Sequence, residues 1–333
     1  MTSIKPQYVY RVLALGIGCG LFIYLLARLG PAEIFALLLQ VGWNFGLIAA
    51  AYTGHQMVRA FALGRCITAD NRASYWDLVM IRLSGETVRF LTFTGPFLAE
   101  PAKALLLRKR GLNTTQAFAA TTAEYLVYTF TSAAMTVAGL MYFLNNFEIP
   151  GSAAAAARIV MYAAGAFLFA AAYAIVRRVY LIGAVLKGIG RLPVAGRYLR
   201  VDEGKLRETE DLLFVVLRAR PWRFLSIVAI EFAAQALLVM ELFVLLRATG
   251  QFFSPAHPFL IESASKFIGF AFFFVPGQIG AAEGTYVLIF EAAGLPALAG
   301  FSLALARRLR TLLVAGAGLA YLLPARSRNN DQC

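Results

Sequence analysis

Long apolar runs dominate the chain, and their lengths predict transmembrane helices. A helix needs about 20 predominantly apolar residues to cross the hydrocarbon core of a bilayer. Six runs reach that length, at residues 8–29, 43–63, 115–144, 155–177, 222–247 and 297–323. We therefore predict an all-α integral membrane protein with about six transmembrane helices.

Two further apolar regions, 76–107 and 259–293, are each interrupted in the middle. The first break is the Thr94–Pro96 stretch and the second is Pro276–Gly280. Because proline and glycine interrupt helices, each region predicts two short helical arms joined by a bend. Short arms cannot each cross a bilayer, so we predict two re-entrant helical hairpins. A pair of kinked full spans is the alternative.

The composition excludes a soluble enzyme and a secreted disulfide-linked domain. Hydrophobic residues make up 60% of the 333 residues and charged residues only 15%, whereas soluble domains carry about 25% charged residues. The three cysteines form no CxxC pair, the two histidines lie far apart in sequence, and no glycine-rich phosphate-binding motif is present. We therefore expect no metal and no cofactor.

Basic residues predict how the chain is oriented in the membrane. The formal net charge is +13, and eleven Lys or Arg residues lie in the 177–223 stretch and eight in 64–111. Because positive loops stay in the cytoplasm, we predict that both termini and the 178–221 linker are cytoplasmic. The linker is expected to form amphipathic helices at the membrane surface. This distribution points to anionic lipid rather than nucleic acid.

An internal repeat relates two parts of this single membrane domain, about 43–144 and about 222–323. A shift of 183 positions aligns Glu100 with Glu283 and gives six identities in 25 positions. Each copy runs from a span through a broken hairpin and a Gly-Leu turn to another span. Since the first hairpin is predicted to enter from the cytoplasm and the second from outside, the repeat is inverted, as in many secondary transporters.

Charged residues inside the predicted membrane segments are the candidates for function, because ionisable groups are costly there. The set chosen as substrate-binding residues lies in or next to the repeated elements: Glu86, Arg89, Glu100, Glu262, Lys266, Glu283, Arg307 and Arg308. A site with both signs of charge suits an anionic or zwitterionic headgroup, which arginine can bind through two hydrogen bonds. Fixed ion pairs that hold the hairpins together are the alternative. Lys103 and the Arg108–Arg110 cluster are expected to anchor in lipid headgroups.

The chain resembles the lysylphosphatidylglycerol synthase transmembrane (flippase-like) family over about residues 8–323. The matching stretches are GETVR at 85–89, PAK at 101–103, ESASK at 262–266, VPGQIGAAEG at 275–284 and ARR at 306–308. The resemblance implies a lipid-translocating module of the bacterial cytoplasmic membrane. In the synthases a soluble aminoacyl-transfer domain follows this region, whereas only about ten residues follow the last predicted span here. We therefore do not expect the synthase reaction.

The favoured hypothesis is a flippase that moves a lipid with a polar headgroup, or an isoprenoid or hopanoid-type lipid, by alternating access. Stand-alone members of this family look like proteins associated with hopanoid, glycolipid or polyprenyl-linked sugar pathways. An accessory protein that scaffolds lipid-biosynthesis enzymes is the first alternative. A lipid-linked glycosyl or headgroup transferase is the second, and the absence of a DxD-like pair argues against it. The sequence does not indicate an oligomeric state.

Overall fold

The computed structural model describes residues 22–25, 27–68, 73–92, 96–147, 151–180, 202–219, 221–250, 253–271 and 278–322. Over these residues all regular structure is helical. The helices are α2 (Pro31–Val41), α3 (Asn44–Cys66), α4 (Tyr75–Leu91), α5 (Pro96–Arg108), α6 (Thr114–Asn146), α7 (Gly151–Arg177), α9 (Glu203–Phe214), the π-helix η1 (Val215–Ala219), α10 (Pro221–Ala248), α11 (Ala256–Ala271), α12 (Ala281–Ala292) and α13 (Ala297–Leu322).

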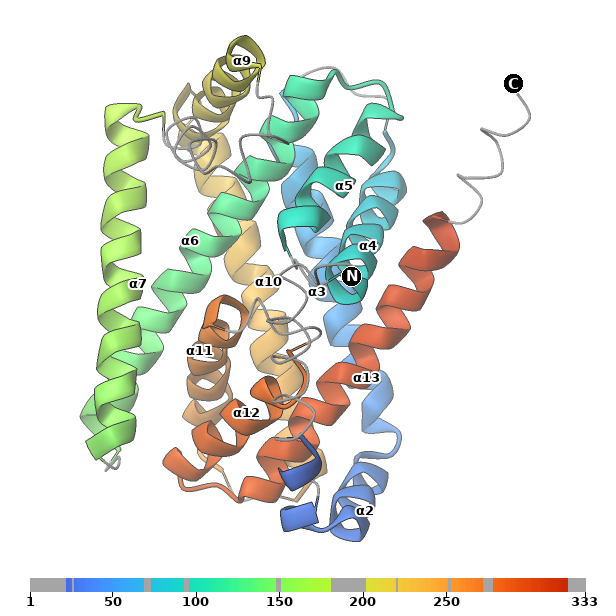
Figure 1. Ribbon diagram of the computed structural model, residues 1–333, viewed down its shortest axis with the longest axis vertical. Coiled ribbons are helices and arrows are strands. Elements are labelled where there is room, and N and C mark those ends of the chain that lie inside the picture. Colours follow the sequence, from blue (N-terminus) through green and yellow to red (C-terminus); the bar gives the residue numbers. More distant parts are fainter. Residues whose placement is uncertain are drawn as a thin grey trace, which may run out of the picture.

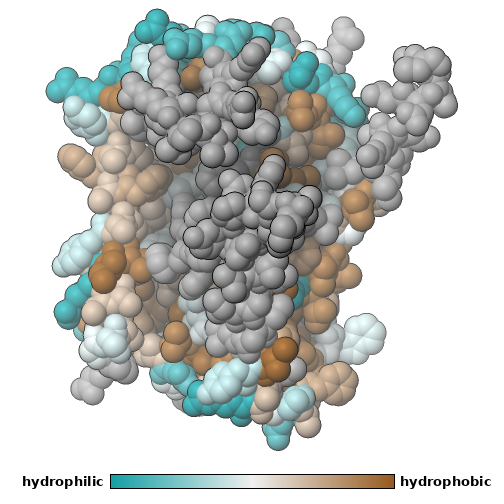
Figure 2. All heavy atoms as spheres, in the orientation of Figure 1, coloured by the Kyte–Doolittle hydropathy of each residue, from teal (hydrophilic) through white to brown (hydrophobic). Residues whose placement is uncertain are grey.

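Three helices are long and apolar enough to cross a membrane by length and composition: α6, α7 and α10. A fourth span results if Phe22–Leu29 and Pro31–Val41, which are bent by 85°, are counted together. Helices α3 and α13 occupy two of the predicted spans but are more polar. Figure 2 shows hydrophilic residues gathered at the top and bottom of the molecule and hydrophobic ones along its flanks between them. These features are those of a multi-pass membrane protein.

Five of the six predicted spans coincide with a helix. Helices α3, α6, α7, α10 and α13 begin and end within a few residues of the expected bounds. The sixth, at 8–29, lies mostly outside the described residues. Both interrupted regions are pairs of helices, α4 with α5 and α11 with α12. Parts of both predicted breaks, at 93–95 and 272–277, fall outside the described residues. Helix α2 was not predicted.

Side-chain caps fix where several helices begin. The Ser74 hydroxyl accepts a hydrogen bond from the Asp77 amide, and the Asp77 carboxylate accepts one from the Ser74 amide, which caps α4. Asn113 and Gln116 form the same reciprocal pair at the start of α6. Asp202 caps α9. Each cap satisfies amide groups that the first helical turn leaves without a partner.

Two glycines make the turns that lead into α6 and α13. Gly111 has φ 100° and Gly294 has φ 73°, backbone conformations that residues with a side chain rarely adopt. Each is followed by a buried leucine, Leu112 or Leu295. The two Gly-Leu pairs that the repeat aligned are therefore equivalent in conformation.

The helices fall into two units of similar contact pattern. The first unit is α2 to α6 and the second is α9 to α13, with α7 between them. Within the units, α3 contacts α4 as α10 contacts α11, and α5 contacts α6 as α12 contacts α13. Across the units, α3 packs on α10, α4 packs on α13 and α11 packs on α6. Exchanging the two units leaves this set of contacts unchanged.

Corresponding helices of the two units lie toward opposite ends of the long axis of the molecule (Figure 1). Helix α2 lies at the bottom of the view and α9 at the top, while the α4–α5 pair occupies the upper half and the α11–α12 pair the lower half. Small residues allow close approach where the units meet. A Cβ atom at Gly318 of α13 would collide with Leu83 and Thr87 of α4, and one at Gly139 of α6 would collide with Ser263 of α11.

Candidate functional site

A buried carboxylate, Glu124 on α6, is surrounded by three cations from the other helices of its unit. The Oε1 atom of Glu124 lies 2.5 Å from Arg59 Nη2 of α3 and 2.5 Å from Arg82 Nη1 of α4. The Oε2 atom lies 3.3 Å from Lys103 Nζ of α5. The Glu124 side chain is fully buried. These contacts, which we name the Glu124 cluster, tie all four helices α3 to α6 together.

The second unit carries a cluster whose central residue has the opposite charge, Arg307 of α13. The guanidinium group donates to Glu262 Oε2 of α11 at 2.6 Å, to Glu241 Oε1 of α10 at 3.2 Å and to the Tyr286 hydroxyl of α12 at 2.6 Å. Lys266 Nζ binds the other oxygen of Glu262 at 2.5 Å. We name these contacts the Arg307 cluster.

The two clusters occupy equivalent places in the two units. The shift of 183 positions found in the sequence places Glu124 on Arg307 and Lys103 on Tyr286. In each unit the last helix, α6 or α13, carries the central residue of the cluster. Each of the three helices before it, α3 to α5 or α10 to α12, contributes one partner. The charge is reversed: a carboxylate with cationic partners in one unit, a guanidinium with two carboxylates in the other.

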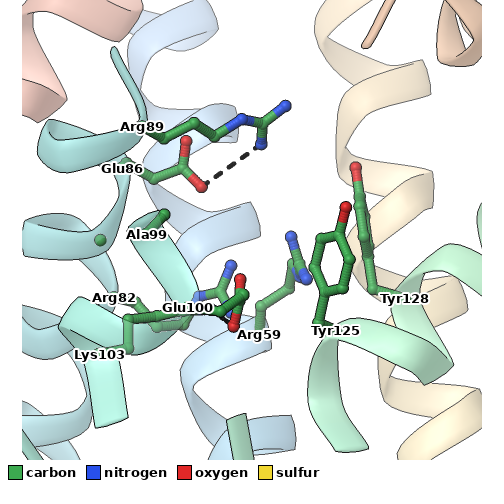
Figure 3. A pocket seen from close by; sticks show the side chains of 10 residues that line it. Arg59, Arg82, Glu86, Arg89, Ala99, Glu100, Lys103, Tyr125 and Tyr128 are labelled. Atoms are coloured by element: carbon green, nitrogen blue, oxygen red, sulfur yellow. Dashed lines mark ion pairs between the residues drawn. The ribbon is translucent and has the colours of Figure 1, made fainter. Parts of the chain in front are cut away.

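A crevice opens beside the Glu124 cluster (Figure 3). It is narrow and open to solvent at one side, with little free space between its walls. Its polar walls are four cations, two carboxylates and two tyrosines, namely Arg59, Arg82, Arg89, Lys103, Glu86, Glu100, Tyr125 and Tyr128. Such a lining suits a small anionic group, because arginine and lysine donate to its oxygens and tyrosine hydroxyls add further donors.

The loosest ion pair of the crevice joins Glu86 and Arg89 of α4. Their closest atoms are 3.7 Å apart, and the Arg89 side chain is 41% exposed, against 12% for Glu86. Figure 3 shows this pair on the wall opposite Tyr125 and Tyr128. By contrast, Lys103 Nζ lies 2.8 Å from Glu100 and is nearly buried. Arg89 is therefore the cation of the crevice that is most available to an incoming ligand.

Two tyrosines lie between the clusters. The Arg59 guanidinium stacks 3.5 Å from the centroid of the Tyr128 ring. Arg310 of α13 stacks 3.7 Å from the Tyr52 ring centroid, and Arg310 also binds Glu241 at 2.9 Å. The Tyr52 hydroxyl donates to Glu86 across 3.4 Å. The aromatic rings thus connect the crevice to the Arg307 cluster through cation–π contacts.

The predicted site residues fall into three groups. Glu86, Arg89 and Glu100 line the crevice. The second group, Glu262, Lys266 and Arg307, forms the Arg307 cluster. The pairs Glu86–Arg89 and Glu262–Lys266, predicted from helical spacing, are both ion pairs. Whether these residues bind substrate stays a prediction.

Glu283 and Arg308 form the third group, a pair of their own. Arg308 Nη2 lies 2.5 Å from Glu283 Oε1. The other oxygen of Glu283 accepts a hydrogen bond from the Gly280 amide at 2.8 Å, which caps α12. With both oxygens engaged and no exposure, Glu283 fixes the start of α12 against α13.

The expectation that Lys103 anchors in headgroups is wrong. Lys103 lies inside the Glu124 cluster because α5 turns it toward α6, where Glu124 and Glu100 neutralise it. The prediction also left Arg82 and Glu231 out of the site. Their signal was present in the sequence, since each is an ionisable residue in an apolar helix.

The part of the chain that the structure describes holds no group of three His, Cys, Asp or Glu residues placed to bind a metal ion. His55 is buried and its Nδ1 lies 2.9 Å from the Ala234 carbonyl oxygen. The two clusters offer ion pairs, hydrogen bonds and carboxylates that can exchange protons.

Comparison with protein families gives one match that covers nearly the whole chain. The model of the lysylphosphatidylglycerol synthase TM region matches residues 11–318. No curated protein and no solved structure matches the chain significantly. The matched residues include both units and both charged clusters.

Proposed function

The chain belongs to the family of the lysylphosphatidylglycerol synthase transmembrane region, and on this premise we propose that it is a flippase-like lipid transporter. Its substrate is a membrane lipid with an anionic or zwitterionic headgroup. The headgroup binds in the crevice beside the Glu124 cluster, and the lipid crosses the bilayer by alternating access. The protein works in the bacterial cytoplasmic membrane with both termini in the cytoplasm.

We propose that the protein has about six spans and two re-entrant hairpins, and that the two units are related as an inverted repeat. The exchangeable contact pattern supports this arrangement, as does the opposite placement of the α4–α5 and α11–α12 pairs in Figure 1. In transporters built this way the substrate site lies near the midplane at the repeat interface. Helices α3 and α10, which pack on each other, form that interface.

The observation that carries the proposal is the loose pair of Glu86 and Arg89 in an otherwise tightly paired crevice. Ion pairs at 2.5 Å neutralise Glu124, whereas Arg89 meets Glu86 only at 3.7 Å. An anionic headgroup oxygen can therefore take the place of the Glu86 carboxylate at Arg89 without breaking the buried pairs. Arginine binds such groups in bidentate geometry.

The test is lipid translocation in proteoliposomes. Lipids with a fluorescent label on one hydrocarbon chain are incorporated in both leaflets, and a membrane-impermeant reductant then quenches the label in the outer leaflet. Complete quenching reports movement between leaflets. The panel comprises phosphatidylglycerol, phosphatidylcholine and a polyprenyl phosphate. The variant is Arg89→Gln, and the matched control is Arg158→Gln, which removes an exposed arginine from α7.

We expect quenching beyond one half for at least one lipid, lost in Arg89→Gln and kept in Arg158→Gln. Movement that is equal in wild type and in Arg89→Gln would overturn the role of the crevice. No movement of any lipid by folded, inserted protein would overturn the transporter and favour a scaffolding role.

A further inference from the structure

Glu231 of α10 is a buried carboxylate with few polar partners to offset its loss of hydration. Its side chain is 0% exposed, and the one ion pair it forms with the described residues is with Arg59 Nε at 3.1 Å. Within the described part of the chain, neither carboxylate oxygen accepts a hydrogen bond. A charged carboxylate removed from water needs such partners, because its desolvation otherwise costs several kcal/mol. Arg59 is close enough to keep Glu231 charged while the crevice is empty, and further negative charge nearby favours the protonated form.

Arg59 forms ion pairs with two carboxylates, and its contact with Glu124 is the closer one. Arg59 Nη2 lies 2.5 Å from Glu124 Oε1, closer than Arg59 Nε lies to Glu231. Glu124 also has Arg82 and Lys103, whereas Arg59 is the sole ion-pair partner of Glu231 among the described residues. Of the two carboxylates, Glu231 is therefore the one that takes a proton more easily.

The charged and titratable groups facing Glu231 come from three neighbouring helices. Helix α3 presents Arg59 and Cys66, α6 presents Glu124, and α4 adds Arg82. The charged residues of the other elements that pack on α10 pair elsewhere or are exposed, namely Glu262 and Lys266 of α11, Arg218 of η1 and Glu33 of α2.

We propose that Glu231 is a proton-binding site, and that binding of an anionic headgroup in the crevice is coupled to uptake of one proton by Glu231. This inference rests on the proposed function and adds a proton as the ion to which lipid transport is coupled. The crevice and the residues behind it carry four cations and four carboxylates, Arg59, Arg82, Arg89, Lys103, Glu86, Glu100, Glu124 and Glu231. A bound monoanion leaves one negative charge in excess, and a proton on a carboxylate oxygen of Glu231 restores neutrality.

The coupling is measured by titration calorimetry on the full chain in detergent. The probe is a short-chain phosphatidylglycerol, and short-chain phosphatidylcholine is the zwitterionic comparison. Each titration is made near pH 7 in two buffers of different ionisation enthalpy, so that the difference in heat counts the protons taken up. The variant is Glu231→Gln, and the matched control is Glu210→Gln, which alters a buried carboxylate of α9 outside the crevice.

We expect uptake of about one proton per bound phosphatidylglycerol in wild type and in Glu210→Gln. Glu231→Gln mimics the protonated state, so it should bind the lipid with no uptake. Binding without uptake in wild type, or uptake that persists in Glu231→Gln, would overturn the coupling while leaving the transporter intact. No binding of either lipid would overturn both. If Glu231→Gln does not fold, the wild-type heats in the two buffers decide.

Discussion

The Glu124 cluster makes a quantitative prediction for the Glu124→Gln variant. When the Glu124 carboxylate is lost, each of its three cations is left with a different polar partner. Lys103 keeps Glu100 at 2.8 Å, and Arg59 keeps Glu231 at 3.1 Å. Arg82 keeps only the neutral amide of Gln56, which accepts from its Nη2 at 3.1 Å and its Nε at 3.3 Å.

The loss in the free energy of unfolding is therefore that of leaving one buried guanidinium group, Arg82, without a negative partner. Arg82 is 2% exposed, and Glu124 is the one carboxylate it meets among the described residues. Breaking a buried pair from one side costs about 3–5 kcal/mol. Removing both partners, in Arg82→Gln with Glu124→Gln, should recover roughly 2 kcal/mol of that loss. Glu86→Gln, which removes the loose partner of a half-exposed arginine, should cost less than about 1 kcal/mol.

The assay is reversible unfolding of purified protein by sodium dodecyl sulfate in mixed micelles, followed by circular dichroism or tryptophan fluorescence. The free energy of unfolding is compared for wild type, the two single variants at Glu124 and Glu86, and the double variant. Equal losses for Glu124→Gln and Glu86→Gln would refute the reasoning. So would a double variant no more stable than Glu124→Gln alone.

Three further outcomes are expected. Gly139→Ala should destabilise the protein by about 1–3 kcal/mol, because its Cβ would collide with α11. Gly165→Ala, inside α7 and in open space, should instead stabilise it by about 0.5–1 kcal/mol, and the same unfolding assay separates the two. Gly111→Ala should cost about 1 kcal/mol through its φ of 100° alone, seen as a lower unfolding midpoint. Arg308→Lys should keep the ion pair to Glu283, so hydrogen exchange at the start of α12 should speed up in Glu283→Gln but not in Arg308→Lys.

Most of the fold could be predicted from the sequence because hydropathy reports helix positions directly. The apolar runs located α3, α6, α7, α10 and α13, and the proline and glycine breaks located the paired arms. Helix α2 was missed because its eleven residues are too few to register as a span.

The site could be predicted only in part, because partners across helices depend on packing. Glu86–Arg89 and Glu262–Lys266 are one helical turn apart, so spacing alone found them. The partnership of Arg82 with Glu124 spans 42 positions and two helices, and no local pattern signals it. Lys103 was misplaced in part for the same reason, because Glu124 lies 21 positions away. Its pair with Glu100, three positions apart, was within reach of the spacing argument.

The role of helix α7 depends on its direction between the two units rather than on its side chains. Its 27 residues span about 40 Å, it contacts α6, and among its side chains only Ala174 is buried. In Figure 1 it carries the chain from the bottom of the molecule back to the top before α9 begins. A connector that crosses once reverses the direction of everything after it. In the proposed inverted repeat, removing α7 would start the second unit at the same end as the first and make the two copies parallel. Its length is thus constrained by the architecture, while its outward surface is free to change.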